Sequence, residues 1–337
     1  MDDTPDHTKG DPAKGDPKTL RITRAEAMEL ATGVLTRHGF SEDEAATIAN
    51  HLVEAELRGH HTTGLIRLIP LVRMAKSRQL MRVVREGPAF VHVDGGGNPG
   101  SLSAEFTMRL AIDKARQHSF ALAALFNSAQ GNISGHYVRL AAEAGFVGIL
   151  LSSTHGSVAP HGGIDPLIGT NPMAFAFPGK ERAVVIDAAT SALTNGDVEV
   201  ARRAGASLPE GAALDADGAP TRVPEEVAAL LPIAGHKGYA FGLALQLLGI
   251  LAGGDALPKY LGNFGFVFLV IDPALFGPAE DFLDRSETLR QAIKTSRRAP
   301  GVDEILLPGE RSDRRRDKNL REGMPIAPAT LDELRRL

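Results

Sequence analysis

Histidine and threonine side chains gather in one short segment, residues 54–64 (Glu-Ala-Glu-Leu-Arg-Gly-His-His-Thr-Thr-Gly). Imidazole accepts or donates a proton near neutral pH, so this segment could carry acid–base chemistry. His60 and His61 are adjacent, and adjacent side chains point in different directions on a helix or a strand. We therefore predict no shared metal site. The segment is either a polar helix end or a helix end that faces a cleft.

A second chemical signal is the sequence Gly-His-Lys-Gly at residues 235–238, directly before the longest apolar stretch of the chain. Backbone N–H groups at the start of a helix attract anions, and Lys237 adds a positive charge. The turns at residues 169–172 (Gly-Thr-Asn-Pro) and 308–310 (Pro-Gly-Glu) could line a cofactor.

Residues 95–100 (Gly-Gly-Gly-Asn-Pro-Gly) formally match the G-x-G-x-x-G pattern of dinucleotide-binding folds, between a predicted strand and a predicted helix. That fingerprint also requires an acidic residue about 20 positions later, at the end of the next strand. The next strand ends at Phe126 and Asn127 without a carboxylate, and Asp113 falls in the middle of a helix. We interpret the glycines as a plain strand-to-helix turn.

The elements that position these groups follow from apolar periodicity and capping signals. Thr23 with Glu26, and Ser41 with Glu44, have the spacing of capping boxes. Three helices are expected in the first 80 residues, at 23–38, 41–58 and 64–76. This part of the chain is predicted to be an all-helical lobe.

Short strands then alternate with helices, which predicts an α/β layer. Strands are expected at 89–94, 120–126, 147–152, 183–187 and 264–271, and helices at 101–118, 137–144 and 238–252. The apolar helix at 238–252 is expected to be buried, and residues 205–235 to be loops. Amphipathic helices at 276–297 and 330–337 are expected to pack back on the first lobe. The mixed-charge run 311–318 is predicted to be a solvated surface.

The predicted domains are a disordered tail at 1–19, a helical substrate and dimer lobe at 20–88 and 274–337, and an α/β cofactor-binding region at 89–273.

Composition excludes several classes of protein. The 37 basic and 41 acidic residues give a net charge of −4, which does not favour nucleic acid or an anionic membrane. Cysteine is absent, which rules out disulfides, thiolate nucleophiles and cysteine-ligated zinc. No signal peptide is recognisable, and the longest apolar stretch is shorter than the ~20 residues that span a bilayer. We expect a cytoplasmic protein.

Eleven short motifs, in order along nearly the whole chain after the tail, are similar to the type-2 malate/L-lactate dehydrogenase family. That family also includes ureidoglycolate, sulfolactate and diketogulonate oxidoreductases, and reductases of the cyclic imines piperideine-2-carboxylate and pyrroline-2-carboxylate. The motifs lie at residues 39–45, 54–60, 64–68, 93–95, 159–163, 169–172, 187–191, 208–211, 235–239, 271–273 and 307–310.

The resemblance implies an α/β fold with a non-Rossmann NAD(P)-binding sheet region and a helical lobe built from both chain ends. It also implies a homodimer with the active site near the interface, and NADPH or NADH as cofactor, the choice remaining open. The implied cofactor-binding residues are Asp187, Ala188, Ala189, Thr190, His236, Lys237, Gly309 and Glu310. Arg67 matches the family's arginine that binds the substrate carboxylate. A guanidinium pairs with a carboxylate through two parallel hydrogen bonds. Thr62 is expected to bind the substrate beside Arg67.

The chain departs from this family where imidazoles are expected. The family usually has Ser-His-Gly where this chain has Thr62-Thr63-Gly64, and a histidine where it has Gln130. Thr63 and Gln130 therefore occupy catalytic positions with side chains that cannot ionise.

The family's tryptophan is His161 here, and a further family histidine is Phe266. We predict that His161 replaces the missing proton donor, with His155 and His60 as second choices. Alternatively, His161 only fills the space of the tryptophan.

The missing imidazoles bear on the substrate. Reducing a ketone creates negative charge on oxygen, and a positioned proton donor contributes about 10²–10⁴-fold. A protonated cyclic imine already carries its charge, so it needs less help. We predict an NAD(P)H-dependent reductase of a small 2-imino or 2-oxo carboxylate, with a cyclic imine favoured. The alternatives are a 2-hydroxy-acid dehydrogenase and a catalytically silent binding protein. The intact cofactor motifs favour an enzyme, whereas Asp197, where the family often has lysine, slightly favours the silent protein.

Overall fold

The computed structural model of the chain describes residues 20–75, 77–129, 131–260 and 262–337. The tail predicted at 1–19 and the predicted catalytic residue Gln130 lie outside the described residues.

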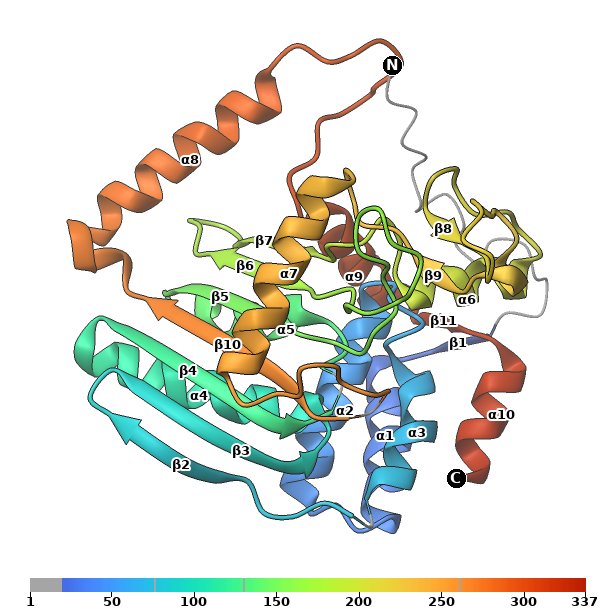
Figure 1. The fold of residues 1–337 in the computed structure, drawn as a ribbon. Helices are drawn as coiled ribbons and strands as arrows, with labels where there is room; N and C mark the ends of the chain where they lie inside the picture. The colour runs from blue at the N-terminus through green and yellow to red at the C-terminus, as the bar shows by residue number, and fades with distance from the viewer. Residues whose placement is uncertain (1–19, 76, 130, 261) are drawn as a thin grey trace.

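A seven-stranded mixed sheet forms the centre of the molecule (Figure 1). Its strands, in spatial order, are β2 (Arg82–Gly87), β3 (Phe90–Asn98), β4 (Phe120–Ser128), β10 (Phe264–Ile271), β5 (Val147–Ser152), β6 (Met173–Phe177) and β7 (Val184–Ala188). Among the described strands of this sheet, β3 and β4 pair in parallel, and the other neighbours are antiparallel. A doubly wound dinucleotide fold has a mostly parallel sheet, so the non-Rossmann expectation is confirmed.

Helices cover both faces of this sheet. The α4 helix (Gly100–His118) and the α5 helix (Ser134–Glu143) enclose the main apolar core, which includes Phe264, Phe266 and Phe268 of β10. The α7 helix (His236–Leu251) crosses the opposite face (Figure 1). Side chains alternate between faces along a strand, so Gly265 points toward α7. A Cβ on Gly265 would collide with the carbonyl oxygen of Gly249, and the close contact requires glycine.

The helical lobe is built from both chain ends, as expected. It contains α1 (Arg24–Arg37), α2 (Glu42–Leu57), η1 (Leu65–Arg67), α3 (Leu68–Met74), α9 (Glu310–Glu322), α10 (Pro328–Arg336) and the ribbon of β1 (Leu20–Ile22) with β11 (Met324–Ile326). Both predicted capping boxes are present, at Thr23 and Ser41. One apolar cluster joins Ile22, Met324 and Leu331 to α1 and α2.

The remaining elements are short, except for one projecting helix. They are α6 (Asn195–Ala204), β8 (Ala213–Leu214), η2 (Pro224–Glu226), β9 (Ala229–Leu230), η3 (Pro273–Phe276) and α8 (Ala279–Thr295). The prediction that residues 276–297 pack back on the first lobe is wrong for α8, which has no buried residue and extends away from the body (Figure 1).

Three further predictions about elements need correction. The glycine turn after residue 94 is instead part of β3, where Gly96 and Gly97 adopt positive φ while the strand continues to Asn98. The segment 82–87, assigned to the helical lobe, is strand β2 and pairs with β3. The apolar helix α7 is not fully buried, since Phe241 is 59% exposed and Leu251 is 78% exposed.

The charged run 311–318 is not a free solvated surface. It forms most of α9, which lies against α2. Arg316 Nε donates to Glu54 Oε2 at 2.7 Å, Asp313 pairs with Arg58, and Asn319 Nδ2 donates to the carbonyl of Leu57 at 2.9 Å. Tertiary ion pairs therefore hold this polar helix in place.

No described helix is long and apolar enough to cross a membrane.

His51 is a polar group inside the lobe. Its ring is fully buried on α2, 4.6 Å from the ring of His136 and 5.2 Å from that of Tyr137. Neither ring nitrogen has a hydrogen-bond partner among the described residues. Burial first, and then the charge of His136, hold the pKa of His51 well below its ordinary 6.5. The fold therefore requires neutral His51.

Acid should consequently destabilise the protein through His51. The unfolded chain binds a proton below about pH 6.5 and the folded chain does not, so the free energy of unfolding should fall by up to ~1.4 kcal/mol per pH unit from this group. Urea unfolding between pH 8 and pH 5 measures the effect. The slope should be shallower in His51→Leu and unchanged in a control, His118→Leu, at an exposed site. Equal slopes in all three proteins would contradict the account.

Candidate active site

A cavity of about 1060 Å³ lies between the helical lobe and one edge of the sheet. This volume is at the upper end of the range for small-molecule and cofactor pockets. The wall comes from the turn after α2, the loops after β4 and β5, the end of β7, α6, and the segment of β11 and α10. Residues from both chain ends and the middle therefore meet in one site.

Arg67 lines this cavity together with Thr62 and Thr63. Its Nε donates to the carbonyl oxygen of Thr62 at 2.8 Å, which fixes the guanidinium at the end of η1. Thr62 lies against Gly196 of α6, where an added Cβ would stand 2.8 Å from Thr62 Oγ1. The Thr63 hydroxyl donates to the carbonyl of His60 at 3.2 Å. The predicted substrate residues Arg67 and Thr62 are thus brought together.

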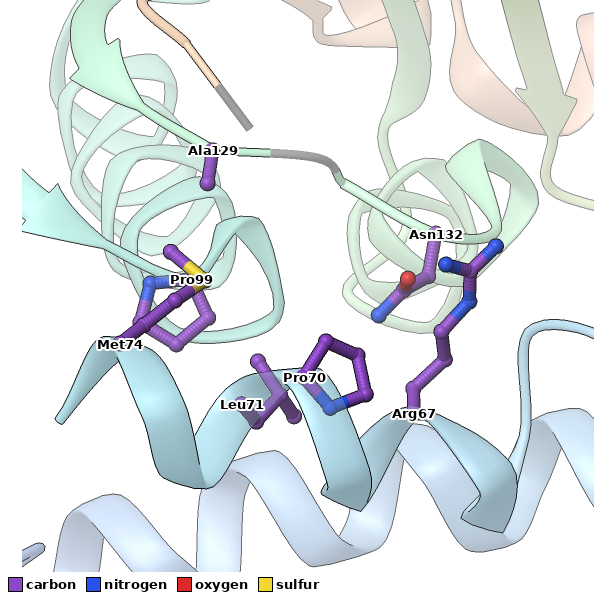
Figure 2. Close-up of a pocket in the computed structure, with 7 residues that line it drawn as sticks. All are labelled: Arg67, Pro70, Leu71, Met74, Pro99, Ala129 and Asn132. Carbon is purple, nitrogen blue, oxygen red and sulfur yellow. The ribbon is translucent and has the colours of Figure 1, made fainter. Parts of the chain in front are cut away.

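A separate small pocket of about 10 Å³ lies beside Arg67 (Figure 2). It is lined by Arg67, Pro70, Leu71, Met74, Pro99, Ala129 and Asn132. The Asn132 side chain lies beside the guanidinium of Arg67 in Figure 2, on a backbone with φ of +59°. Asparagine tolerates this left-handed conformation better than most residues. This small pocket has room for about one water molecule at most, so a ligand must occupy the larger cavity.

Three imidazoles line the cavity: His60, His61 and His155. His61 Nδ1 bonds Glu56 Oε2 at 2.7 Å, and Glu56 Oε1 accepts from the backbone N–H of Leu65 at 3.0 Å. The pair therefore braces the turn between α2 and η1. His60 is exposed to the cavity, but the surrounding protein desolvates it and, with the charge of Arg58, lowers its pKa to about 4, so His60 is neutral near pH 7.

His155 follows β5 and is half-buried. Its ring stands 5.2 Å from the ring of Tyr260 and 6.3 Å from that of Phe264. Asn195 Nδ2 at the start of α6 lies 3.4 Å from His155 Nε2. Burial, and then the charge of Arg67, hold the pKa of His155 below its ordinary value.

His161, the residue predicted to replace the proton donor, is not among the residues that line the cavity. It is exposed, and its ring centre stands 6.0 Å from that of His236. His161 therefore neighbours the start of α7, on the side expected to hold the cofactor. Its catalytic role stays a prediction.

The strand end at residues 187–190 forms one wall of the site. Asp187 and Ala189 line the cavity, and Ala188 is exposed between them. Asp187 Oδ2 accepts from the backbone N–H of Gly135 at 2.7 Å, at the start of α5. The carboxylate opens to the cavity at one side, but the surrounding protein desolvates it and raises its pKa to about 6, against the lowering effect of backbone hydrogen bonds from Gly135 and Ser134.

The other predicted cofactor residues lie at two helix starts. His236 and Lys237 begin α7, whose N-cap Gly235 supplies no side-chain cap. Gly309 is the N-cap of α9, also without a side-chain cap, and packs against the carbonyl of Val185 in β7. Uncapped helix starts attract phosphate, and a carboxylate such as Asp187 can accept hydrogen bonds from ribose hydroxyls. The residues present therefore fit a nicotinamide nucleotide.

Glu310 is already engaged within the chain. Its Oε2 accepts from Lys294 Nζ at 2.7 Å and from the backbone N–H of Leu307 at 3.1 Å. It braces the turn before α9, and its contact with a cofactor stays a prediction.

Asn171 is a buried residue behind the cavity wall, which the sequence indicated only as part of a turn. It is fully buried, and its Nδ2 donates to the carbonyl of Gly242 at 2.8 Å and to Gln246 Oε1 at 2.9 Å, both on α7. Its Oδ1 accepts from the backbone N–H of Thr154 at 2.9 Å. The Thr190 hydroxyl donates to the carbonyl of neighbouring Thr170 at 3.1 Å. This network joins α7, the loop after β5 and the end of β7.

Solved structures share this architecture over nearly the whole chain. Malate dehydrogenase from Pyrococcus horikoshii OT3 superposes with a TM-score of 0.86 at 31% identity, covering 94% of each chain. Δ1-piperideine-2-carboxylate reductase from Pseudomonas syringae pv. tomato superposes with a TM-score of 0.85 at 31% identity, covering 94% of this chain and 99% of the other. Fold and site together define an α/β oxidoreductase with a non-Rossmann sheet.

Sequence comparison identifies the family. The model of the malate/L-lactate dehydrogenase family matches residues 22–335. The chain is 35% identical to malate dehydrogenase of Pyrococcus abyssi, covering 95% of this chain and 94% of the relative. It is 32% identical to ureidoglycolate dehydrogenase (NAD+) of Escherichia coli, covering 91% and 93%. The chain belongs to the malate/L-lactate dehydrogenase family, whose members are NAD(P)-dependent dehydrogenases, and the resemblance stated above is confirmed.

The raised pKa of Asp187 can be observed at the amide that it binds. The ¹⁵N and ¹H resonances of Gly135 should shift with a midpoint near pH 6, because protonation of Asp187 weakens the hydrogen bond that Gly135 donates. In Asp187→Asn this transition should be absent. A midpoint near 3.8, the ordinary value for aspartate, would contradict the described environment.

Proposed function

We propose that the protein is a 2-hydroxy-acid dehydrogenase of the malate and lactate type. It would transfer a hydride between a nicotinamide nucleotide, NADH or NADPH, and a small 2-hydroxy or 2-oxo carboxylate. The observation that carries the proposal is the position of Arg67 at the cavity wall. Its guanidinium is held by the carbonyl of Thr62 at the wall of a cavity that also contains ionisable imidazoles. A cation for the carboxylate and a source of protons are what ketone reduction requires.

This proposal reverses the order of the two substrate classes inferred from the sequence. The cyclic imine was favoured because imidazoles are missing at Thr63 and Gln130. Another imidazole, that of His155, lines the cavity and could donate a proton, so the reason for preferring a preprotonated substrate is weakened. The identities point the same way, with 35% to a malate dehydrogenase and 33% to a pyrroline-2-carboxylate and piperideine-2-carboxylate reductase of Pseudomonas putida.

Cyclic-imine reduction remains the second candidate. It is supported by Thr63, whose hydroxyl is bonded to the backbone and cannot ionise, and by the similarity to the two Pseudomonas reductases. The silent family member is the third. It predicts no turnover of either class.

The first test is initial-rate measurement with NADH and NADPH against 2-oxo acids, including oxaloacetate and pyruvate, and against piperideine-2-carboxylate and pyrroline-2-carboxylate. We expect turnover of a 2-oxo acid. Arg67→Lys should raise KM for that acid by about 10- to 100-fold, because lysine cannot form two parallel bonds to a carboxylate. Arg73→Lys, at an exposed residue of the same cavity, is the matched control. Turnover of the imines alone would replace the proposal with the second candidate.

We also propose that the protein is a homodimer. Two features support this. The α7 helix presents large apolar side chains to solvent, namely Phe241, Leu243, Leu247, Ile250 and Leu251. The α8 helix has no buried residue in the single chain, although Leu289 and nearby Phe276 are apolar and exposed. An apolar face of this kind is typical of an interface between subunits.

Charge on the α7 face should therefore dissociate the dimer. Phe241→Asp places a desolvated carboxylate in an apolar contact, so we expect a monomer by analytical ultracentrifugation at micromolar concentration. Leu80→Asp is the control, because Leu80 is 84% exposed outside α7 and α8. A wild-type monomer, or a Phe241→Asp variant that stays dimeric, would contradict the proposed interface.

A further inference from the structure

We infer that His155 is the catalytic acid–base residue of this protein, because it lines the cavity with Arg67 and is anchored to the strand end at residues 187–190. The inference rests on the proposed function, because it names the group that exchanges a proton with the substrate oxygen. It assigns the role to a residue remote in sequence from Thr63 and Gln130, where the family usually carries histidine.

The first argument is the position of His155 relative to the strand end at residues 187–190, which is expected to bind the cofactor. His155 directly follows Thr154, whose backbone N–H donates to Asn171 Oδ1 at 2.9 Å and whose Oγ1 lies 3.4 Å from Thr170 Oγ1. The carbonyl of Thr170 accepts from the hydroxyl and from the backbone N–H of Thr190, at the end of β7. His155 is thereby anchored to the strand end that the resemblance assigns to the cofactor.

The second argument is position relative to the substrate arginine. Asn195 Nδ2 lies 3.4 Å from His155 Nε2. The next residue, Gly196, packs against Thr62, and the carbonyl of Thr62 holds Arg67 Nε. His155 and Arg67 line the same cavity, and the charge of Arg67 is felt at the His155 ring. A proton donor for the 2-oxo group must reach the same cavity as the carboxylate clamp, and His155 lines that cavity with Arg67.

The third argument is that packing fixes the orientation of the His155 ring while both of its protonation states can be hydrogen-bonded. Tyr260 meets it edge-on and Phe264 lies roughly parallel to it, so the imidazole plane is fixed by packing. Asn195 donates to the neutral ring through its amide nitrogen, and after rotation its amide oxygen can accept from the protonated ring. Both protonation states therefore have a partner.

The other histidines of the site fit the role less well. His60 has a pKa of about 4 and is neutral near pH 7. His61 is bonded to Glu56, which also holds the backbone of Leu65, so this pair has a bracing role. His161 does not line the cavity.

Charge coupling links this residue to substrate binding. Arg67 is the cation that acts on His155, while nearby acidic groups already have partners. Asp197 caps α6 through Thr194, Glu199 pairs with Arg202 and Arg203, and Asp187 bonds Gly135. A carboxylate that binds Arg67 cancels its charge, which raises the proton affinity of His155. The imidazole thus gains its proton when a substrate is present.

A bound nicotinamide nucleotide would supply the hydride for the new C–H bond at C2 of the 2-oxo acid and would be oxidised in return. The electron pair of the C=O π bond moves to oxygen, and that oxygen takes a proton from the His155 imidazolium. The products are a 2-hydroxy acid and neutral His155. In the reverse direction, neutral His155 removes the hydroxyl proton.

Histidine NMR tests the coupling without turnover. The His155 ¹³Cε1 resonance, assigned by its loss in His155→Gln, is titrated with pH with and without saturating oxalate, a non-reducible mimic of a 2-oxo carboxylate. We expect oxalate to raise the His155 midpoint by about one pH unit, and Arg67→Gln to abolish that rise. The exposed His118 should not respond. Oxalate that binds, by calorimetry, without moving the His155 midpoint would overturn the inference.

Kinetics provide the second readout. His155→Gln should lower kcat for the 2-oxo acid by about 10²–10³-fold, remove one limb of the pH profile of kcat/KM, and leave the Kd for NADH unchanged. Turnover that survives His155→Gln would overturn the inference and leave the proposed function standing. Absence of both oxalate binding and turnover in the wild type would overturn the proposed function, and the inference with it.

Discussion

The buried carboxamide of Asn171 is the constraint on which the site depends. Its hydrogen bonds join Gly242 and Gln246 of α7 to the loop that carries Thr154 and His155. A buried amide left without partners costs about 1–3 kcal/mol for each unpaired group, so these segments are fixed relative to one another. The start of α7, the end of β7 and the proposed proton donor therefore hold their positions together.

The cavity contains both a cation, Arg67, and a carboxyl group with a raised pKa, Asp187. The charge of Arg67 lowers the pKa of His155 after burial has done so. In the same cavity, desolvation raises the pKa of Asp187 to about 6. Groups whose pKa values are shifted from their ordinary values, such as an imidazole and a carboxyl group in one cavity, are common at catalytic sites. The same cavity can thus bind a small anion and exchange a proton with it.

The sequence predicted the elements whose signals are local. Capping boxes located α1 and α2, and apolar runs located β4, β5 and β10. It missed α9, because that helix is charged throughout and is held by tertiary ion pairs such as Arg316 with Glu54. The resemblance predicted that Arg67 binds the substrate carboxylate, and the structure places Arg67 at the cavity. The pairing of His155 with Asn195 could not be predicted, because it joins positions 40 residues apart through the fold.

The most direct test is a crystal structure of the protein with NADH and oxalate. The account predicts oxalate on the guanidinium of Arg67 and a ring nitrogen of His155 within hydrogen-bond distance of an oxalate oxygen. The phosphates should lie at the helix starts of α7 or α9. Oxalate bound away from Arg67, or a His155 ring turned away from both ligands, would contradict it.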